Sequence, residues 1–272
     1  MLDTRWSAPT RCAHVTAAPN IELPILDERS LLFLHGDDGP LAAQPFLDAL
    51  RAYMAPGAEL ATPVCPGWSG EPLPVWLRTV DQLAYHYLDA VERVATTPIT
   101  AIGASFGAWL LLEMATKQPQ LFSTLVLISP VGVKVTDRET AQFADLFARD
   151  IDARASALFA DPEAAMQRTA ALDDEGLAAF AVAQEATARF GWEPYLHNPL
   201  LRHRLHRVTC PTAVVYGEHD RFVQNIDYYA QLSQLMGGHK YLITVARAGQ
   251  RVDQEQPALL AEFVSEFLNR SR

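Results

Sequence analysis

The chain has 272 residues, of which 49% are hydrophobic and 20% are charged, a composition typical of globular proteins. Its formal net charge of −10 argues against nucleic acid or an anionic membrane surface as a partner. No apolar run approaches the roughly 18 residues that a membrane-spanning helix needs. The first residues lack the apolar core of a signal peptide, and three widely spaced cysteines cannot form a complete disulfide set. We therefore expect a cytoplasmic protein with free thiols.

The first part of the chain alternates short apolar runs with amphipathic stretches, a pattern typical of βα units and a mostly parallel sheet. Each apolar run is short enough for a strand that is buried on both faces. The expected elements are strands at 31–34, 59–64, 99–104 and 124–129, and helices at 41–54, 79–94 and 106–117.

From about residue 135 to 207 the pattern changes to successive helices without a convincing strand. Helix starts are expected at Thr136 with Glu139, at Asp161 to Glu163, and at 172–175. An all-helical insertion between two βα halves predicts a cap over the carboxyl ends of the strands, where open α/β sheets bind ligands.

After the insertion the βα pattern returns. The expected elements are strands at 212–217 and 241–246 and helices at 225–236 and 257–269. We therefore assign residues 1–134 and 208–272 to an α/β core and residues 135–207 to a helical cap domain.

The segment Gly103 to Gly107 reads GASFG and lies between an expected strand and an expected helix. This is the G-x-S-x-G arrangement in the strand–turn–helix context that a nucleophile elbow requires. Glycines at both ends allow a sharp turn that exposes the Ser105 hydroxyl above the sheet. The amide of Phe106, at the helix start, then suits the binding of a developing oxyanion.

With these motifs the chain resembles the α/β-hydrolase superfamily, in the branch that carries a helical cap. The resemblance covers nearly the whole chain and rests on four motifs in the family's order. They are HG at 35–36, GASFG at 103–107, YGEHD at 216–220 and AGQRVDQEQP at 248–257. It implies an eight-stranded, mostly parallel sheet flanked by helices. It also implies Ser105 as nucleophile, Asp220 as the acid, and Asp37 and Phe106 as the oxyanion donors through their backbone amides.

Position 250 departs from the family pattern. Relatives carry A-G-H where this chain has Ala248, Gly249 and Gln250, so a glutamine stands where the resemblance places the catalytic histidine. The glutamine amide can donate and accept hydrogen bonds, and could bridge Asp220 and Ser105. It cannot hold a proton near neutral pH, so it cannot act as a general base. We expect ordinary hydrolysis by the serine to be impaired.

Other side chains near the expected mouth are candidates for the pocket. His35 is usually structural in relatives, while a carboxylate at Asp37 or Asp38 could do acid–base work if burial raised its pKa. In the cap, Trp192 and Tyr195 lie on a segment that overlies the pocket in relatives. Trp68 could fringe the entrance. The sequence carries no metal signature, and we expect neither a metal nor another cofactor.

Three functions remain open from the sequence. The first is an enzyme acting on a small ester, thioester or C–C substrate, whose histidine has been replaced naturally or by an inactivating change. The second is a non-hydrolytic catalyst, such as a cyclase or lyase, that uses orientation and electrostatics in the same pocket. The third is a non-catalytic receptor for a small molecule. All three take a small molecule as partner, and the oligomeric state is not encoded in any pattern that we recognise.

Overall fold

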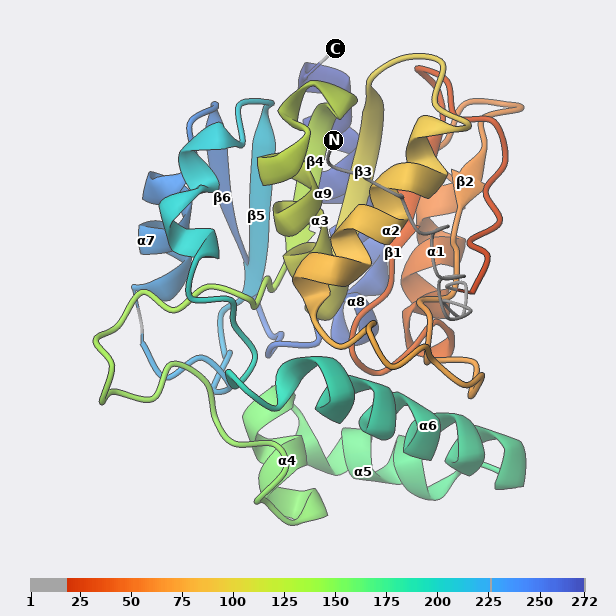
Figure 1. Cartoon of the computed structure of the whole chain (residues 1–272). Coiled ribbons are helices and arrows are strands. Elements are labelled where there is room, and N and C mark those ends of the chain that lie inside the picture. Colours follow the sequence, from red (N-terminus) through yellow and green to blue (C-terminus); the bar gives the residue numbers. More distant parts are fainter. Residues whose placement is uncertain (1–18, 226, 272) are drawn as a thin grey trace, which may run out of the picture.

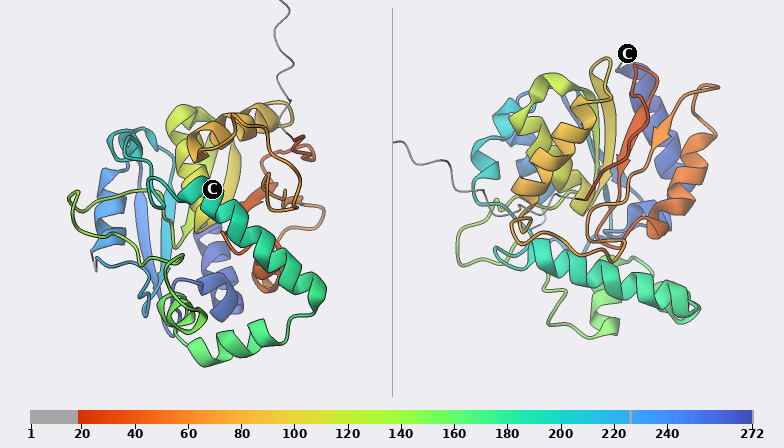
Figure 2. Two further views of the ribbon diagram at one scale, coloured as in Figure 1. Left: turned by 60° about the horizontal axis from the view of Figure 1, so that its bottom comes forward. Right: turned by 45° about the vertical axis from the view of Figure 1, so that its right-hand side comes forward.

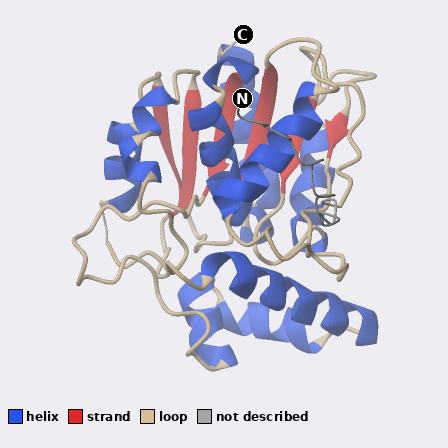
Figure 3. Ribbon diagram, in the orientation of Figure 1, coloured by secondary structure: helices blue, strands red, loops and turns tan. Residues whose placement is uncertain are grey.

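A computed structural model of the protein describes residues 19–225 and 227–271. Its centre is one sheet of six strands in the order β2-β1-β3-β4-β5-β6, and all of the neighbouring pairs are parallel. Figure 3 shows this sheet as the middle layer between helices. The strands are β1 (Leu31–Leu34), β2 (Leu60–Ala61), β3 (Ile99–Ala104), β4 (Phe122–Ile128), β5 (Thr212–Gly217) and β6 (Lys240–Val245).

The prediction of eight strands is wrong for the described part of the chain. Residues 19–30, which precede β1, contribute only an isolated bridge between Leu26 and Ala95. The segment expected as a strand at 59–64 pairs over two residues, because only Leu60 and Ala61 remain in register with β1. The predicted parallel arrangement is confirmed.

The two faces of the sheet build two separate apolar cores, since alternate side chains of a strand point to opposite faces. In β1, Leu32 and Leu34 join the core under α2 (Val80–Glu92) and α3 (Phe106–Lys117). Leu31 and Phe33 join the core under α1 (Gln44–Arg51) and α9 (Pro257–Arg270). Figure 1 shows α2 and α3 in front of the sheet and α9 behind it.

The insertion between β4 and β5 forms three helices, and Figures 1 and 2 show them beside the carboxyl ends of the strands. They are α4 (Ile151–Leu158), α5 (Pro162–Ala170) and α6 (Asp174–Gly191). The predicted starts at Asp161 and Asp173 are confirmed, since each carboxylate accepts a hydrogen bond from the backbone amide three residues later.

The predicted helix start at Thr136 is wrong. Asp137 accepts hydrogen bonds from the amides of Glu139 and Thr140, and the Thr136 hydroxyl donates to the Thr140 carbonyl. These local bonds satisfy the backbone in a turn and compete with a helix. The chain stays irregular until Asp150 caps α4.

Two short helices follow the inserted segment. Helix α7 (Tyr228–Leu235) lies between β5 and β6, and α8 (Val252–Glu255) follows the loop that carries Gln250. Cys65 and Cys210 are buried and form no disulfide within the described part of the chain, and Cys12 lies outside it. Among the described residues, none of the helices combines the length and apolarity needed to cross a membrane.

Candidate active site

Ser105 sits at the turn between β3 and α3 with a φ of 44°, a left-handed conformation that is uncommon for a residue other than glycine. Gly107 permits this turn because a Cβ there would lie 2.1 Å from the Leu34 carbonyl oxygen of β1. A Cβ at Gly103 would similarly lie 2.6 Å from the Gly107 carbonyl carbon. The elbow predicted from GASFG is therefore packed directly against the neighbouring strand, as close backbone approach requires.

We expect Gly107→Ala to disrupt the elbow, because the added methyl would overlap backbone atoms that cannot move independently. The free energy of unfolding should fall by about 3 kcal/mol, measured by urea denaturation. Gly36→Ala is the matched control, since its Cβ would meet nothing closer than 3.5 Å. Equal stability of the two variants would contradict this account of the turn.

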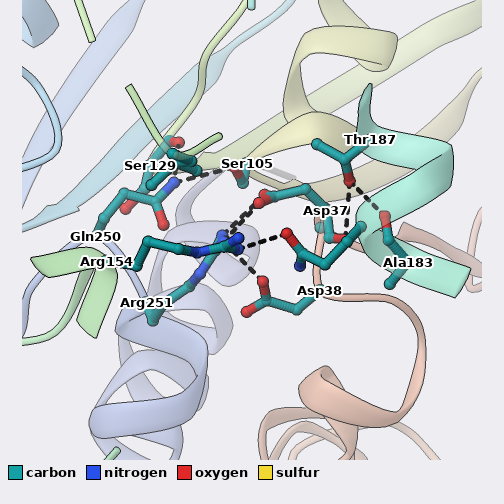
Figure 4. A network of polar contacts seen from close by, with 12 residues as sticks. Asp37, Asp38, Ser105, Ser129, Arg154, Ala183, Thr187, Gln250 and Arg251 are labelled. Carbon is teal, nitrogen blue, oxygen red and sulfur yellow. Dashed lines mark hydrogen bonds and ion pairs between the residues drawn. The ribbon is translucent and has the colours of Figure 1, made fainter. Parts of the chain in front are cut away.

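Gln250 contacts the serine, although its loop lies 145 residues away in the chain. Its Nε2 donates to Ser105 Oγ at 3.0 Å and lies 3.4 Å from the carbonyl oxygen of Ser129 (Figure 4). The orientation of the amide follows from this second contact, because a carbonyl oxygen can only accept. Gln250 therefore occupies the position beside Ser105 where a base would be needed, and it presents a donor there.

Asp220 is engaged elsewhere, so the predicted bridge through Gln250 is not present. One carboxylate oxygen accepts from the amides of Phe222 and Val223, and the other accepts from the Tyr229 hydroxyl at 2.5 Å. Meanwhile Gln250 Oε1 is buried and has no hydrogen-bond partner among residues 19–225 and 227–271. The loops themselves are neighbours, because His219 donates from its backbone to the Ala248 carbonyl. Only the side-chain connection between acid and glutamine is missing.

A buried ion-pair cluster joins the loop after β1 to the residue that follows Gln250. Arg251 donates twice to Asp37, at 2.8 and 2.5 Å, and once to Asp38 at 2.7 Å (Figure 4). The Arg251 side chain is 4% exposed, so these charges are removed from water and depend on each other. Gln254 adds a hydrogen bond to Asp38. The cluster fixes the loop that the resemblance assigns to the oxyanion hole.

The two aspartates of this cluster differ in their protonation. Burial opposes ionisation of Asp37, but the Arg251 guanidinium prevails and lowers the pKa of Asp37 to about 2. The Ser105 side chain and the Asp37 backbone also lower the pKa of Asp37. Burial raises the pKa of Asp38 above its usual value. Asp37 is therefore a weak base beside the serine, and the predicted acid–base role fits Asp38 better.

Asp253 is a further buried carboxyl group at this site, which sequence reasoning missed. Burial raises its pKa to about 7, and Asp38 and Asp37 reinforce the shift against the opposing charge of Arg251. Asp253 lines one cavity together with Ser105, Gln250, Arg251 and Asp38. The cavity leaves about 10 Å³ for the centre of a water-sized molecule, which is room for about one water.

His35 connects the loop after β1 to the loop that carries Cys65 through hydrogen bonds of both ring nitrogens. Its Nδ1 donates to the Gly36 carbonyl at 2.8 Å, and its Nε2 accepts from the Cys65 amide at 2.9 Å. Burial lowers the pKa of His35 to about 4, so the imidazole stays neutral. Both ring nitrogens are used, and His35 is not available to Ser105 as a base.

The cap aromatics do not line the cavity beside Ser105. Trp192 is 62% exposed and packs against Phe147, so its side chain does not line this cavity. Tyr195 joins two parts of the inserted segment, since its hydroxyl donates to the Ala144 carbonyl and accepts from the Leu146 amide. Both side chains therefore pack within the segment between β4 and β5.

Trp68 does not fringe an entrance, because it is buried. Its indole stacks on Phe190 of α6 and packs against Phe106 and His35, while Nε1 donates to the Asp37 carbonyl. The Asp37 carbonyl also accepts from Thr187 of α6 (Figure 4). Loop, cap helix and elbow are thus packed as one unit, and this shared packing has no signal in the local sequence.

Residues 31–263 match the family described as "Alpha/beta hydrolase family". The chain belongs to this family. Among curated proteins, none matches the sequence. The fold is shared with solved structures of low sequence identity. A bacterial membrane phospholipase A is 17% identical, with a TM-score of 0.68 over 93% of this chain and 86% of the other.

Two further structures illustrate the range of the fold. The 2-hydroxy-6-oxo-6-phenylhexa-2,4-dienoate hydrolase of Rhodococcus sp. strain RHA1 is 18% identical, with a TM-score of 0.63 over 89% of this chain and 91% of the other. Naproxen esterase of Bacillus subtilis is 16% identical, with a TM-score of 0.66 over 92% of this chain and 87% of the other. At such identities the likeness extends to the fold, and the chemistry must be argued from the site.

Proposed function

We propose that the chain is an enzyme of the α/β-hydrolase family that binds a small carbonyl-containing substrate at Ser105, with ordinary serine hydrolysis impaired by Gln250. The substrate carbonyl would lie above the elbow. The Phe106 amide is the first of α3 and has no partner within the helix, so it is free to donate to an oxyanion. The Asp37 amide would be the second donor.

The contact between Gln250 and Ser105 carries this proposal. An amide donor 3.0 Å from Ser105 Oγ covers the lone pair that would attack a carbonyl. Asp37 interacts with the Ser105 side chain, and its low pKa makes it a poor acceptor of the serine proton. The hydroxyl therefore contacts a donor and a weakly basic carboxylate, and neither of them activates it.

The oxyanion site is also affected by Asp37. An ionised carboxylate beside the expected oxyanion disfavours further negative charge. Arg251 compensates part of this charge through its two hydrogen bonds to Asp37.

A non-hydrolytic catalyst is the second candidate, and the partners of Asp220 and Arg251 favour it. A recent loss of a histidine would leave Asp220 without a partner, yet Tyr229 fills that role at 2.5 Å. The residue after Gln250 is built into a buried ion-pair cluster. Such adjustments suit a pocket reused for a reaction driven by orientation and electrostatics, such as an elimination or cyclisation.

Labelling with a fluorophosphonate separates these candidates. We expect the unmodified chain to label at Ser105 only slowly, because the attacking oxygen has no base, and Gln250→His to label at least about 100-fold faster. The rate is measured by mass spectrometry of the labelled peptide, with Ser105→Ala as the blank. Fast labelling of the unmodified chain would contradict the proposed inactivity of the serine. Substrate turnover that persists in Ser105→Ala would establish the non-hydrolytic candidate.

A further inference from the structure

The cavity beside Ser105 has an excess of acidic groups. Asp37 and Asp38 after β1 and Asp253 in α8 contribute three carboxyl groups. The positive groups acting on them are Arg251, and Arg154 from α4 of the cap. With all five groups ionised, the cluster would carry one uncompensated negative charge. In the described chain, the charged groups with the largest effects on the pKa of Asp253 are Arg251, Asp38 and Asp37.

The arginines donate their hydrogen bonds to other groups, so neither of them forms an ion pair with Asp253 in the described chain. Arg251 uses Nη1 and Nη2 for Asp37 and Asp38, and Arg154 hydrogen-bonds Gln184 of α6. Asp253 is 6% exposed and shares the cavity with Asp38. A buried carboxyl group without a dedicated cation retains its proton to higher pH, which agrees with a pKa of Asp253 near 7.

An independent observation indicates that a hydrogen-bond donor belongs in this cavity. Gln250 lines it, is 2% exposed, and its Oε1 has no partner. A buried carbonyl oxygen left unpaired costs free energy that a ligand donor would recover. Arg251 Nε also lacks a partner, which a ligand hydroxyl could satisfy. The excess of carboxyl groups decides between a neutral and a charged ligand donor, because it favours a donor that carries positive charge.

We propose that the cavity beside Ser105 binds the protonated amino group of a primary amine substrate, between Gln250 Oε1 and the carboxylates of Asp253 and Asp38. The inference rests on the proposed function, since it assigns the substrate chemistry of the same site. An ammonium group has about the size of a water molecule, which the cavity admits, and it offers three donors. It completes the charge balance of the cluster and leaves the substrate carbonyl toward the elbow.

A divalent metal ion fits these residues less well than an ammonium group does. Among residues 19–225 and 227–271, no cluster of three or more histidine, cysteine, aspartate or glutamate side chains is arranged to hold one. The Arg251 guanidinium in the cavity wall also opposes a double positive charge. A single positive charge on an organic group matches the cluster.

Binding can be measured without turnover by titration calorimetry with n-butylammonium chloride at constant ionic strength set by sodium chloride. n-Butanol and sodium butyrate, which have the same number of carbon atoms, are the neutral and the anionic control ligands. We expect n-butylammonium alone to bind, with an affinity about tenfold higher at pH 8 than at pH 6. Asp253 changes from mostly protonated to mostly ionised across a pKa of about 7, while the amine stays charged at both values.

Variants assign the effect to the cavity. Asp253→Asn should lower the affinity for n-butylammonium and remove its pH dependence, and exposed Asp174→Asn should change neither. Equal binding of butanol or butyrate, binding that does not depend on pH in the unmodified chain, or an unaltered affinity of Asp253→Asn would each overturn the proposal. If n-butylammonium binds but Ser105 is labelled fast, the proposed function alone is contradicted. If Ser105 is labelled slowly but n-butylammonium does not bind, this inference alone is contradicted.

Discussion

Gln250→His is expected to restore esterase activity toward a small activated ester, and Tyr229→Phe should increase the gain. A histidine at this position can accept the Ser105 proton, a contribution of about 10²- to 10⁴-fold in general base catalysis. Its effect depends on Asp220, which must orient the imidazole. In the unmodified chain the Tyr229 hydroxyl holds an oxygen of Asp220 at 2.5 Å and competes for this role.

We therefore expect kcat/KM to rise about 10²-fold in Gln250→His and at least about tenfold more when Tyr229→Phe is added. Tyr229→Phe alone should produce no activity, since glutamine still lacks a titratable proton. Adding Ser105→Ala to the double variant should abolish the gain. A double variant that folds but stays as inactive as the parent would argue that the pocket serves another reaction, and it would favour the non-hydrolytic candidate.

Replacement of Arg251 by methionine is expected to destabilise the fold by about 3–5 kcal/mol at pH 7, because it leaves buried Asp37 and Asp38 without their cation. Arg51→Met is the matched control. It removes an ion pair to Asp48 whose side chains are 48% and 63% exposed, so the loss should stay below about 1 kcal/mol. Urea denaturation at several pH values measures both.

The pH dependence of the Arg251→Met effect has a defined sign. In the unmodified chain the pKa of Asp37 is lowered to about 2, so its stabilising effect is present at neutral pH and is lost as the pH falls toward 2. Without Arg251, burial raises this pKa in the folded state, so stability decreases as the pH rises through it. The difference between variant and parent should shrink from pH 7 to pH 4. A difference that does not vary with pH would contradict the assigned charge on Asp37.

Adding Asp37→Asn and Asp38→Asn to Arg251→Met provides a separate test of the ion-pair cluster. Removal of all three charges should recover much of the lost stability, since neutral groups of similar shape replace a buried ion cluster at little net cost. A triple variant as unstable as Arg251→Met would indicate that Arg251 acts through packing of its aliphatic stem.

Sequence reasoning could recover the fold because each of its signals is local. Short apolar runs predicted the strands β1, β3 and β5, and GASFG between strand and helix located the elbow. The β2 and Thr136 errors have different causes. Pairing with a neighbour ended the strand after Ala61, and side-chain bonds of Asp137 stabilised a turn where the helix was expected.

The sequence by itself determined that Ser105 lies at a sharp turn between a strand and a helix, and it supplied the expectation that Gln250 replaces a histidine. It could not show which partners those groups find, because hydrogen bonds across 145 or 214 residues depend on how the strands and loops come together. The tertiary structure decided that Gln250 donates to the serine, that Tyr229 takes Asp220, and that Arg251 is buried between Asp37 and Asp38. Burial and neighbouring charge also separate the pKa of Asp37 from that of Asp253, although the free side chains are chemically identical.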